Sequence, residues 1–199
     1  MQDDLFGDTL PKPPPAEAAA SAPASPIVPG TDAPTRRSLS GTVAPIAPDG
    51  ALTALAAALP PRLRLGTSSW TYPGWKGLVW EGEHSDTQLS KRGLAVYAQH
   101  PLMRTVSIDR SFYRPLTVSQ YERYASQVPD DFRFVVKAPS VVTDALVRSE
   151  DGRGRQPNPA FLSPELARSE CVEPALQGLG HKLGCLLYTS DAADDTPCV

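Results

Sequence analysis

The stretch GTSSWTYPGW, residues 66–75, follows the short run Leu63-Arg64-Leu65, which is typical of a β-strand. Two further stretches repeat this arrangement, TVSIDRSFYRP at 105–115 and FRFVVKAP at 132–139. Each is a short apolar run that ends in polar and aromatic residues. Parallel strands deliver side chains of this kind to one face of a β/α barrel. The recurrence therefore predicts three parallel strands whose ends carry a functional site.

Helices are predicted between these strands. A helix over 87–98 follows the first strand, and the pair Thr117 and Gln120 forms a capping box that begins the next helix. A further helical stretch is predicted over 163–180, interrupted at Pro174. A fourth strand should begin near Lys182. Alternating strands and helices with short connections predict right-handed βαβ units, a parallel sheet and the α/β class.

Proline and aromatic residues are unevenly distributed along the 199 residues. Residues 1–62 hold 12 of the 22 prolines and one aromatic residue, whereas residues 63–137 hold 11 of the 14 aromatics. Residues 1–48 are therefore predicted to be a disordered Pro/Ala-rich tail that cannot offset its ordering entropy. The run 51–59 is predicted to be a helix, too short to span a bilayer. Without a recognisable signal peptide, a cytoplasmic protein with no membrane contact is expected.

The last fifteen residues, 185–199, are predicted to be foreign to the protein. From Cys185 the text CLLYTSDAADD is the in-frame translation of the end of a transposase-based sequencing-library adapter. A natural acidic tail is the alternative. Without this tail, 22 acidic residues become 19 against 19 basic ones, and the net charge of −3 becomes zero. Charge therefore indicates no partner, and the remaining Cys171 predicts neither a disulfide nor a zinc site.

Three motifs in this order resemble the YecE-like family, domain of unknown function 72: GTSSW with Tyr72 and Trp75, SFYR at 111–114, and FVVK at 134–137. The resemblance covers about residues 55–184 and implies a (β/α)8 TIM-barrel-like fold. A barrel of this kind takes about 250 residues. Residues 49–184 are therefore expected to be a partial barrel domain, truncated after about three β/α units, and the chain to be a fragment.

The chain departs from the pattern of this family at two places. The family commonly reads Val-Glu-x-Asn before the second motif, whereas Val106 is followed here by Ser107, and Asp109 takes the place of the Asn. After the third strand, the family often has Thr-His where this chain has Thr143-Asp144. An acid or base role of that Glu or His therefore does not transfer to this chain.

Two residues at strand ends are predicted to be catalytic. Lys137 ends the third strand, and a lysine at a barrel mouth suits Schiff-base, proton-transfer or phosphate-binding roles. Asp109 follows the second strand and would be a general base, a metal ligand or the partner of Lys137. A purely structural pair of Lys137 with Asp109 is the alternative. Because one carboxylate does not define a metal site, none is predicted, and no cofactor is identified.

A larger group of residues after the first two strands is predicted to bind substrate: Ser68, Trp70, Tyr72, Ser111, Tyr113 and Arg114. The aromatic members could stack on a sugar or a nucleobase, and the guanidinium of Arg114 suits phosphate or carboxylate. Aromatic residues near strand ends also serve in packing, which is the favoured interpretation for Trp75 and Phe112.

The N-terminal residues suggest a protein partner. Gln2-Asp3-Asp4-Leu5-Phe6 resembles the short peptide by which bacterial proteins dock on the DNA-polymerase sliding clamp. The resemblance implies that Gln2, Leu5 and Phe6 anchor in pockets of the clamp, and a disordered tail suits such a motif. The second position, usually apolar in such peptides, is Asp3 here.

Two functions remain open from the sequence. The first is an enzyme that, when full length, acts on a phosphate- or sugar-bearing substrate with Lys137, Asp109, Tyr113 and Arg114 at the barrel mouth. The second is a nucleic-acid-associated binding module recruited through the N-terminal peptide. The 199-residue fragment itself is expected to be inactive.

Overall fold

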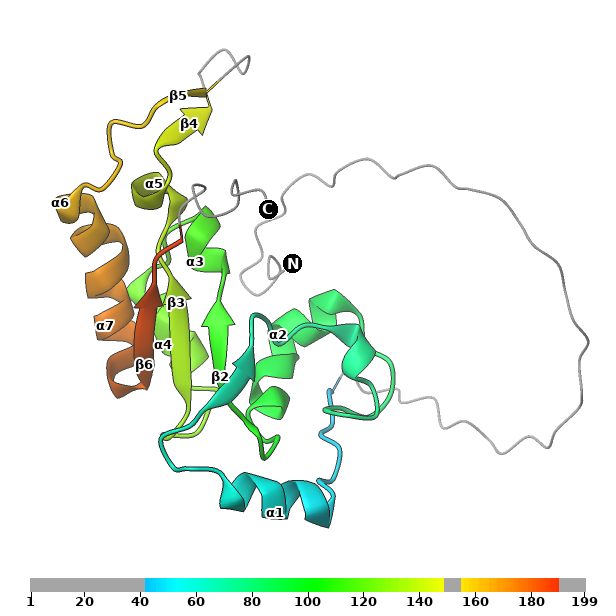
Figure 1. The fold of residues 1–199 in the computed structure, drawn as a ribbon. Coiled ribbons are helices and arrows are strands. Elements are labelled where there is room, and N and C mark those ends of the chain that lie inside the picture. The colour runs from blue at the N-terminus through cyan, green and yellow to red at the C-terminus, as the bar shows by residue number, and fades with distance from the viewer. Residues whose placement is uncertain (1–41, 149–154, 190–199) are drawn as a thin grey trace, which may run out of the picture.

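The structure is a computed structural model that describes residues 42–148 and 155–189 (Figure 1). Four parallel strands form the main sheet, in the spatial order β1 (Leu65–Thr67), β2 (Met103–Ile108), β3 (Arg133–Lys137) and β6 (Leu183–Leu187). The longer helices are α1 (Gly50–Ala58), α2 (Asp86–Tyr97), α4 (Val118–Ala125) and α7 (Glu173–Leu179). The predicted α/β class and parallel sheet are confirmed.

Shorter elements fill the connections. Single helical turns are formed by η2 (Pro73–Trp75), α3 (Arg110–Tyr113), α5 (Ser140–Thr143), α6 (Pro164–Ala167), η3 (Arg168–Val172) and η4 (Gly180–Lys182). The strands β4 (Leu146–Arg148) and β5 (Arg155–Pro157) pair as an antiparallel hairpin, beyond the end of the sheet toward which β2 and β3 point (Figure 1).

Local sequence signals determine where the helices begin and end. Ser85 and Thr117 cap α2 and α4. In each helix the side-chain oxygen of the glutamine three residues later accepts a hydrogen bond from the backbone amide of the capping residue. The capping box predicted at Thr117 and Gln120 is therefore confirmed. At the end of α7, Gly180 has a φ of 54°, which glycine adopts without strain.

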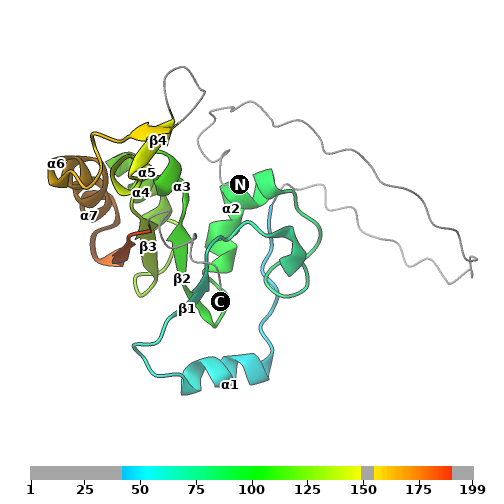
Figure 2. The ribbon, with the colours of Figure 1, turned by 45° about the horizontal axis from the view of Figure 1, so that its top comes forward.

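The main sheet has two different faces because side chains alternate along its strands. Val106, Ile108, Phe134 and Val136 are fully buried and belong to one core cluster with side chains of α4 and α7. Figures 1 and 2 show these two helices side by side on this face. On the opposite face the side chains are only partly buried, and these are the side chains of Thr105, Ser107, Val135 and Lys137.

Two glycines allow backbones to approach closely. A Cβ atom at Gly66, the first residue of the stretch 66–75, would lie 1.9 Å from the carbonyl oxygen of Thr105 on β2. A Cβ atom at Gly178 of α7 would lie 2.5 Å from the carbonyl oxygen of Val118 on α4. Only a residue without a Cβ atom fits at these positions, so Gly66 and Gly178 maintain the spacing of β1 from β2 and of α4 from α7.

The N-terminal prediction holds in part. Helix α1 is capped by Asp49, as expected for the helix predicted over 51–59. The predicted disordered tail includes residues 42–48, whereas in the structure Val43 is buried in a small apolar cluster and Pro45 forms a β-bridge with Trp80. Residues 1–41 lie outside the described residues. No helix in the described ranges combines the length and apolar character needed to cross a bilayer.

The expected fourth strand is present. Strand β6 begins at Leu183, close to the predicted start at Lys182, and its Leu187 lies opposite Lys137 of β3. The strand runs through Cys185, where the predicted foreign tail starts. Strand pairing uses backbone groups and makes little demand on side chains, so many sequences can form a strand at this edge. Residues 190–199 lie outside the described residues.

Candidate functional site

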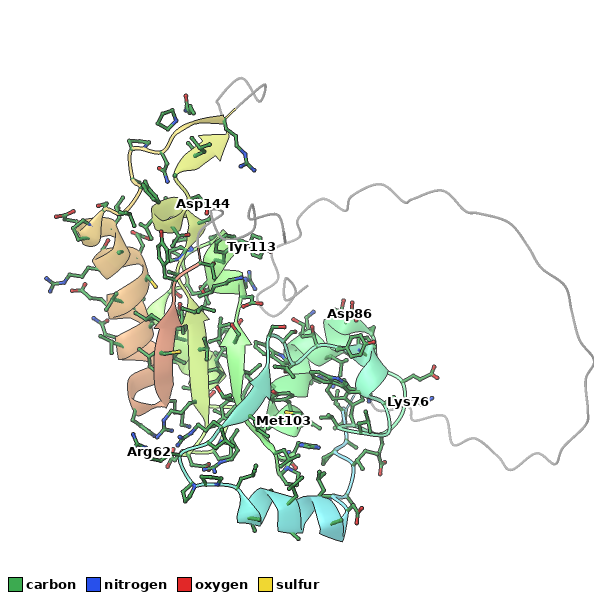
Figure 3. All side chains as sticks on the ribbon, in the orientation of Figure 1. Arg62, Lys76, Asp86, Met103, Tyr113 and Asp144 are labelled. Atoms are coloured by element: carbon green, nitrogen blue, oxygen red, sulfur yellow. The ribbon has the colours of Figure 1, made fainter. Side chains whose placement is uncertain are left out.

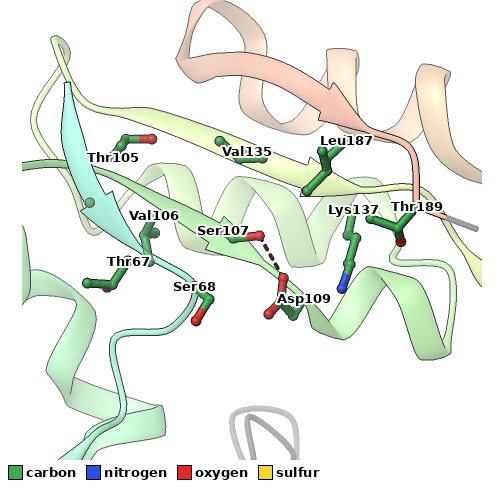
Figure 4. Close-up of a pocket in the computed structure, with 11 residues that line it drawn as sticks. Thr67, Ser68, Thr105, Val106, Ser107, Asp109, Val135, Lys137, Leu187 and Thr189 are labelled. Atoms are coloured by element: carbon green, nitrogen blue, oxygen red, sulfur yellow. Dashed lines mark hydrogen bonds between the residues drawn. The ribbon is translucent and has the colours of Figure 1, made fainter. Parts of the chain in front are cut away.

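A pocket of about 320 Å³ lies at the carboxyl ends of the parallel strands, on the face that α4 and α7 leave uncovered (Figure 4). Each of the four strands of the sheet contributes residues to its lining. Its polar side chains come from Thr67, Ser68, Thr105, Ser107, Asp109, Lys137 and Thr189. The convergence of these groups follows from parallel pairing, which brings the ends of consecutive strands to one edge.

Lys137 extends into this pocket from the last position of β3. Its Nζ atom lies 5.1 Å from the centre of the Phe112 ring, which is a cation–π contact. Within the described ranges the ammonium takes part in no hydrogen bond or ion pair, so the structural pair with Asp109, which was the alternative to a catalytic role, does not form. Figure 4 shows the side chains of Lys137 and Asp109 directed toward the same opening. The ammonium is therefore available to an anionic ligand.

Asp109 follows β2 directly and is held by its own strand. The hydroxyl of Ser107 donates a hydrogen bond to Asp109 Oδ1 at 2.7 Å (Figure 4). Asp109 also stands at the start of α3, but its side chain makes no capping bond there. The carboxylate is thus oriented by Ser107 toward the pocket. Among the described residues, no group of three or more His, Cys, Asp or Glu side chains could hold a metal ion.

Ser111, predicted to bind substrate, has a positioning role instead. It is 1% exposed, and its hydroxyl lies 2.7 Å from the carbonyl oxygen of Ile108 and 2.6 Å from that of Lys137. One proton serves both acceptors, so the hydroxyl joins the end of β2 to the end of β3. Ser111 therefore helps to fix the backbone of Lys137 and is not accessible to a ligand.

Trp70, also predicted to bind substrate, lies in the core. Its side chain is fully buried, and its ring meets the ring of Tyr124 edge to face with centroids 5.4 Å apart. A large aromatic ring gains more from burial than from exposure at a strand end. The structure therefore removes Trp70 from the candidate site and assigns it to packing.

The remaining predicted substrate-binding residues are exposed but do not line the pocket. Tyr72 is 60% exposed and Tyr113 is 80% exposed, and Arg114 is exposed as well. Tyr72 packs edge-on against Trp75, and Tyr113 packs edge-on against Phe112. Of the six predicted substrate-binding residues, Ser68 is the one in the lining. Gln2, Leu5 and Phe6, predicted to bind a clamp, lie outside the described residues.

Two hydroxyl residues of β2 that line the pocket were not predicted as ligand candidates. Thr105 and Ser107 lie on β2 and face the pocket, whereas Val106 and Ile108 between and after them are buried on the other face. The alternation of polar and apolar residues along 105–108 carries this information, because successive side chains of a strand point to opposite faces.

Two tyrosines behind the sheet take no part in proton exchange at neutral pH. Burial raises the pKa of Tyr124 to about 12, although the nearby Arg110 acts in the opposite direction. Burial also raises the pKa of Tyr121, which lies on the same helix. Both phenols therefore remain neutral, and the titratable groups that face the pocket are Asp109 and Lys137.

The fold and the site define an α/β protein with a polar pocket at the carboxyl ends of its parallel strands. The chain belongs to the family described as protein of unknown function DUF72, whose model matches residues 64–189. It is also similar to the crystal structure of a DUF72 family protein from Enterococcus faecalis V583, with 20% sequence identity and a TM-score of 0.39. That similarity covers 63% of this chain and 39% of the other chain. Among curated proteins, no match was found.

Proposed function

We propose that the chain is part of a cytoplasmic (β/α)8 barrel enzyme, and that the complete protein acts on a phosphate- or sugar-bearing small molecule. The observation that supports this most is the ammonium of Lys137, which has no polar partner in the described ranges and shares a pocket with Asp109 (Figure 4). Sites in β/α barrels lie at this end of the strands. A pocket of about 320 Å³ is at the lower end of the range for small-molecule sites.

Each polar residue at this site would have a separate role. Lys137 would bind the anionic group of the substrate, because an ammonium forms strong charge-assisted hydrogen bonds with phosphate oxygens. Asp109, oriented by Ser107 at 2.7 Å, would accept a proton from a substrate hydroxyl. The hydroxyls of Ser68 and Thr105 would bind sugar hydroxyls. Ser111 would hold the strand end that carries Lys137.

Replacing Lys137 by methionine should weaken binding of ribose 5-phosphate about tenfold or more, because a charge-assisted hydrogen bond is lost. Binding of uncharged ribose should change little. Isothermal titration calorimetry measures both affinities. Lys76→Met is the matched control, since Lys76 is exposed, pairs with Glu83 and lies outside the pocket. Equal affinities of wild type and Lys137→Met for ribose 5-phosphate would contradict the proposed role.

Turnover separates the enzyme from the alternative, a nucleic-acid-associated module recruited through Gln2, Leu5 and Phe6. Sugar phosphates are to be screened with the protein encoded by the complete reading frame. Asp109→Asn should bind a substrate as wild type does and lower kcat about 100-fold or more, the usual contribution of a general base. Ligand binding without turnover, together with competition by single-stranded nucleic acid, would favour the module.

We also propose that residues 185–199 are not native and that the natural reading frame continues differently after Gly184. The gene, amplified from its source and sequenced across codon 184, should then encode another apolar strand and further β/α units. Because the family match extends to residue 189, we expect the natural sequence also to form a strand in the place of β6. Recovery of the CLLYTSDAADD text from the source DNA would refute the proposal.

A further inference from the structure

A segment that precedes the family match packs onto the domain. This strap, residues 43–49, is held by two backbone hydrogen bonds, from the amide of Ile46 to the carbonyl of Val79 at 3.1 Å and from the amide of Glu81 to the carbonyl of Ala44 at 2.9 Å. Val43 is buried in an apolar cluster beside them. The strap therefore has a defined position, although the family model begins only at residue 64.

A second cavity, of about 400 Å³, lies between the strap, the start of α1 and the start of β2. Its walls are mainly apolar, with side chains from Ile46, Leu52, Trp75, Leu78 and Met103. Figure 3 shows Met103 at the base of β2, between α1 and the loop that carries Lys76. The cavity is separate from Lys137 and Asp109, and only Thr67 lines both.

The polar side chains that line this cavity already form hydrogen bonds within the protein. Asp49 caps the backbone of α1, and the hydroxyl of Thr67 donates to the carbonyl of Ser69 at 2.7 Å. His100 Nδ1 accepts a hydrogen bond from the amide of Leu102 at 3.3 Å. A neutral His100 then carries its proton on Nε2, and this N–H has no partner within the described ranges. Burial lowers the pKa of His100, which favours the neutral ring.

We propose that this cavity binds a small uncharged aromatic molecule with one hydrogen-bond acceptor, which the Nε2–H of His100 orients. An apolar wall that includes an indole and a thioether favours an aromatic ring. An anionic ligand would find no cationic partner there, because no Lys or Arg lines the cavity and its one charged lining residue is Asp49. The volume suits a molecule of one or two rings. This inference does not rest on the proposed enzymatic function.

The test compares p-cresol with toluene, which differ by one hydroxyl, on the full 199-residue chain with ligand-detected NMR titrations. Both should bind saturably, and p-cresol should bind roughly three- to tenfold more tightly because of one neutral hydrogen bond. His100→Phe should remove this difference while toluene still binds. Ribose 5-phosphate should displace neither probe, which distinguishes this cavity from the pocket of Lys137.

Cavity-filling variants decide where the probes bind. Ala47→Phe and Leu52→Trp place rings in the cavity from two walls and should each abolish binding of both probes. Ala57→Phe is the matched control, because Ala57 is exposed on α1 outside the lining, and it should bind as wild type. Unchanged binding in both filling variants, no saturable binding by either probe, or a chain without a cooperative unfolding transition would each overturn the proposal.

Discussion

Replacing Trp70 by alanine is expected to lower the free energy of unfolding by about 3–5 kcal/mol, the range for a buried aromatic residue truncated to a methyl group. The ring is fully buried and packs on Tyr124. Helix α2 passes so close that a Cβ atom at Gly93 would lie 3.3 Å from the carbonyl oxygen of Trp70. The helix is thus constrained at this point and cannot easily collapse into the space. Urea denaturation followed by circular dichroism measures the change.

Tyr72→Ala is the matched control for this prediction. Tyr72 lies two residues further along, in the same motif, and is 60% exposed with one edge-on aromatic contact. Its loss should change the free energy of unfolding by less than about 1 kcal/mol, as is usual for an exposed position. If Trp70→Ala keeps wild-type stability but loses ligand binding, the indole belongs to a binding site and the packing assignment is wrong.

The contrast between these two residues shows what the sequence could and could not predict. The short apolar runs and the capping box at Thr117 and Gln120 predicted strands and helices of the domain to within a few residues, since these signals are local. The rule that sites of β/α barrels lie after the strands then placed Trp70, Tyr72 and Ser111 among the predicted substrate-binding residues. Whether Trp70 turns inward depends on the path of the following loop and on α2 behind it, which no local pattern records.

Ser111 illustrates the same limit on a smaller scale. Its place after β2 predicted a ligand contact, but two carbonyl oxygens at the strand ends need a donor and lie within 2.7 Å of its hydroxyl. Buried carbonyls without partners are costly, so the structural use prevails. The hairpin of β4 and β5 escaped prediction for another reason. Three-residue strands are too short to show a period.

The sequence placed one charged residue at each of two neighbouring strand ends. Asp109 and Lys137 were placed after neighbouring strands, and the structure brings both into the lining of one pocket. The orientation of Asp109 by Ser107 was not anticipated, because it depends on two side chains of β2 on the same face. Their catalytic roles stay predictions until turnover is measured.

Replacing Lys182 by methionine is expected to lower the free energy of unfolding by about 2–5 kcal/mol, because two carbonyl oxygens lose a charged donor. Lys182 is 9% exposed, and its Nζ donates to the carbonyl of Ala125 at 2.9 Å and to that of Val128 at 2.8 Å. These carbonyls belong to the end of α4 and the turn after it, where helical partners are missing. Methionine keeps the length and the apolar stem of the side chain, so the change isolates the ammonium.

Lys76→Met is the control here as well. Its ammonium lies 2.7 Å from Glu83, but both side chains are more than half exposed, and such a pair contributes at most about 1 kcal/mol. The exposed Asp130, 3.4 Å from Lys182, should contribute as little, so Asp130→Asn separates its effect from that of the carbonyls. Equal stabilities of Lys182→Met and Lys76→Met in urea denaturation would show that water replaces the ammonium at the end of α4. A decrease in the free energy of unfolding that occurs in Lys182→Met alone would show that this lysine stabilises the contact between the end of α4 and the start of β6.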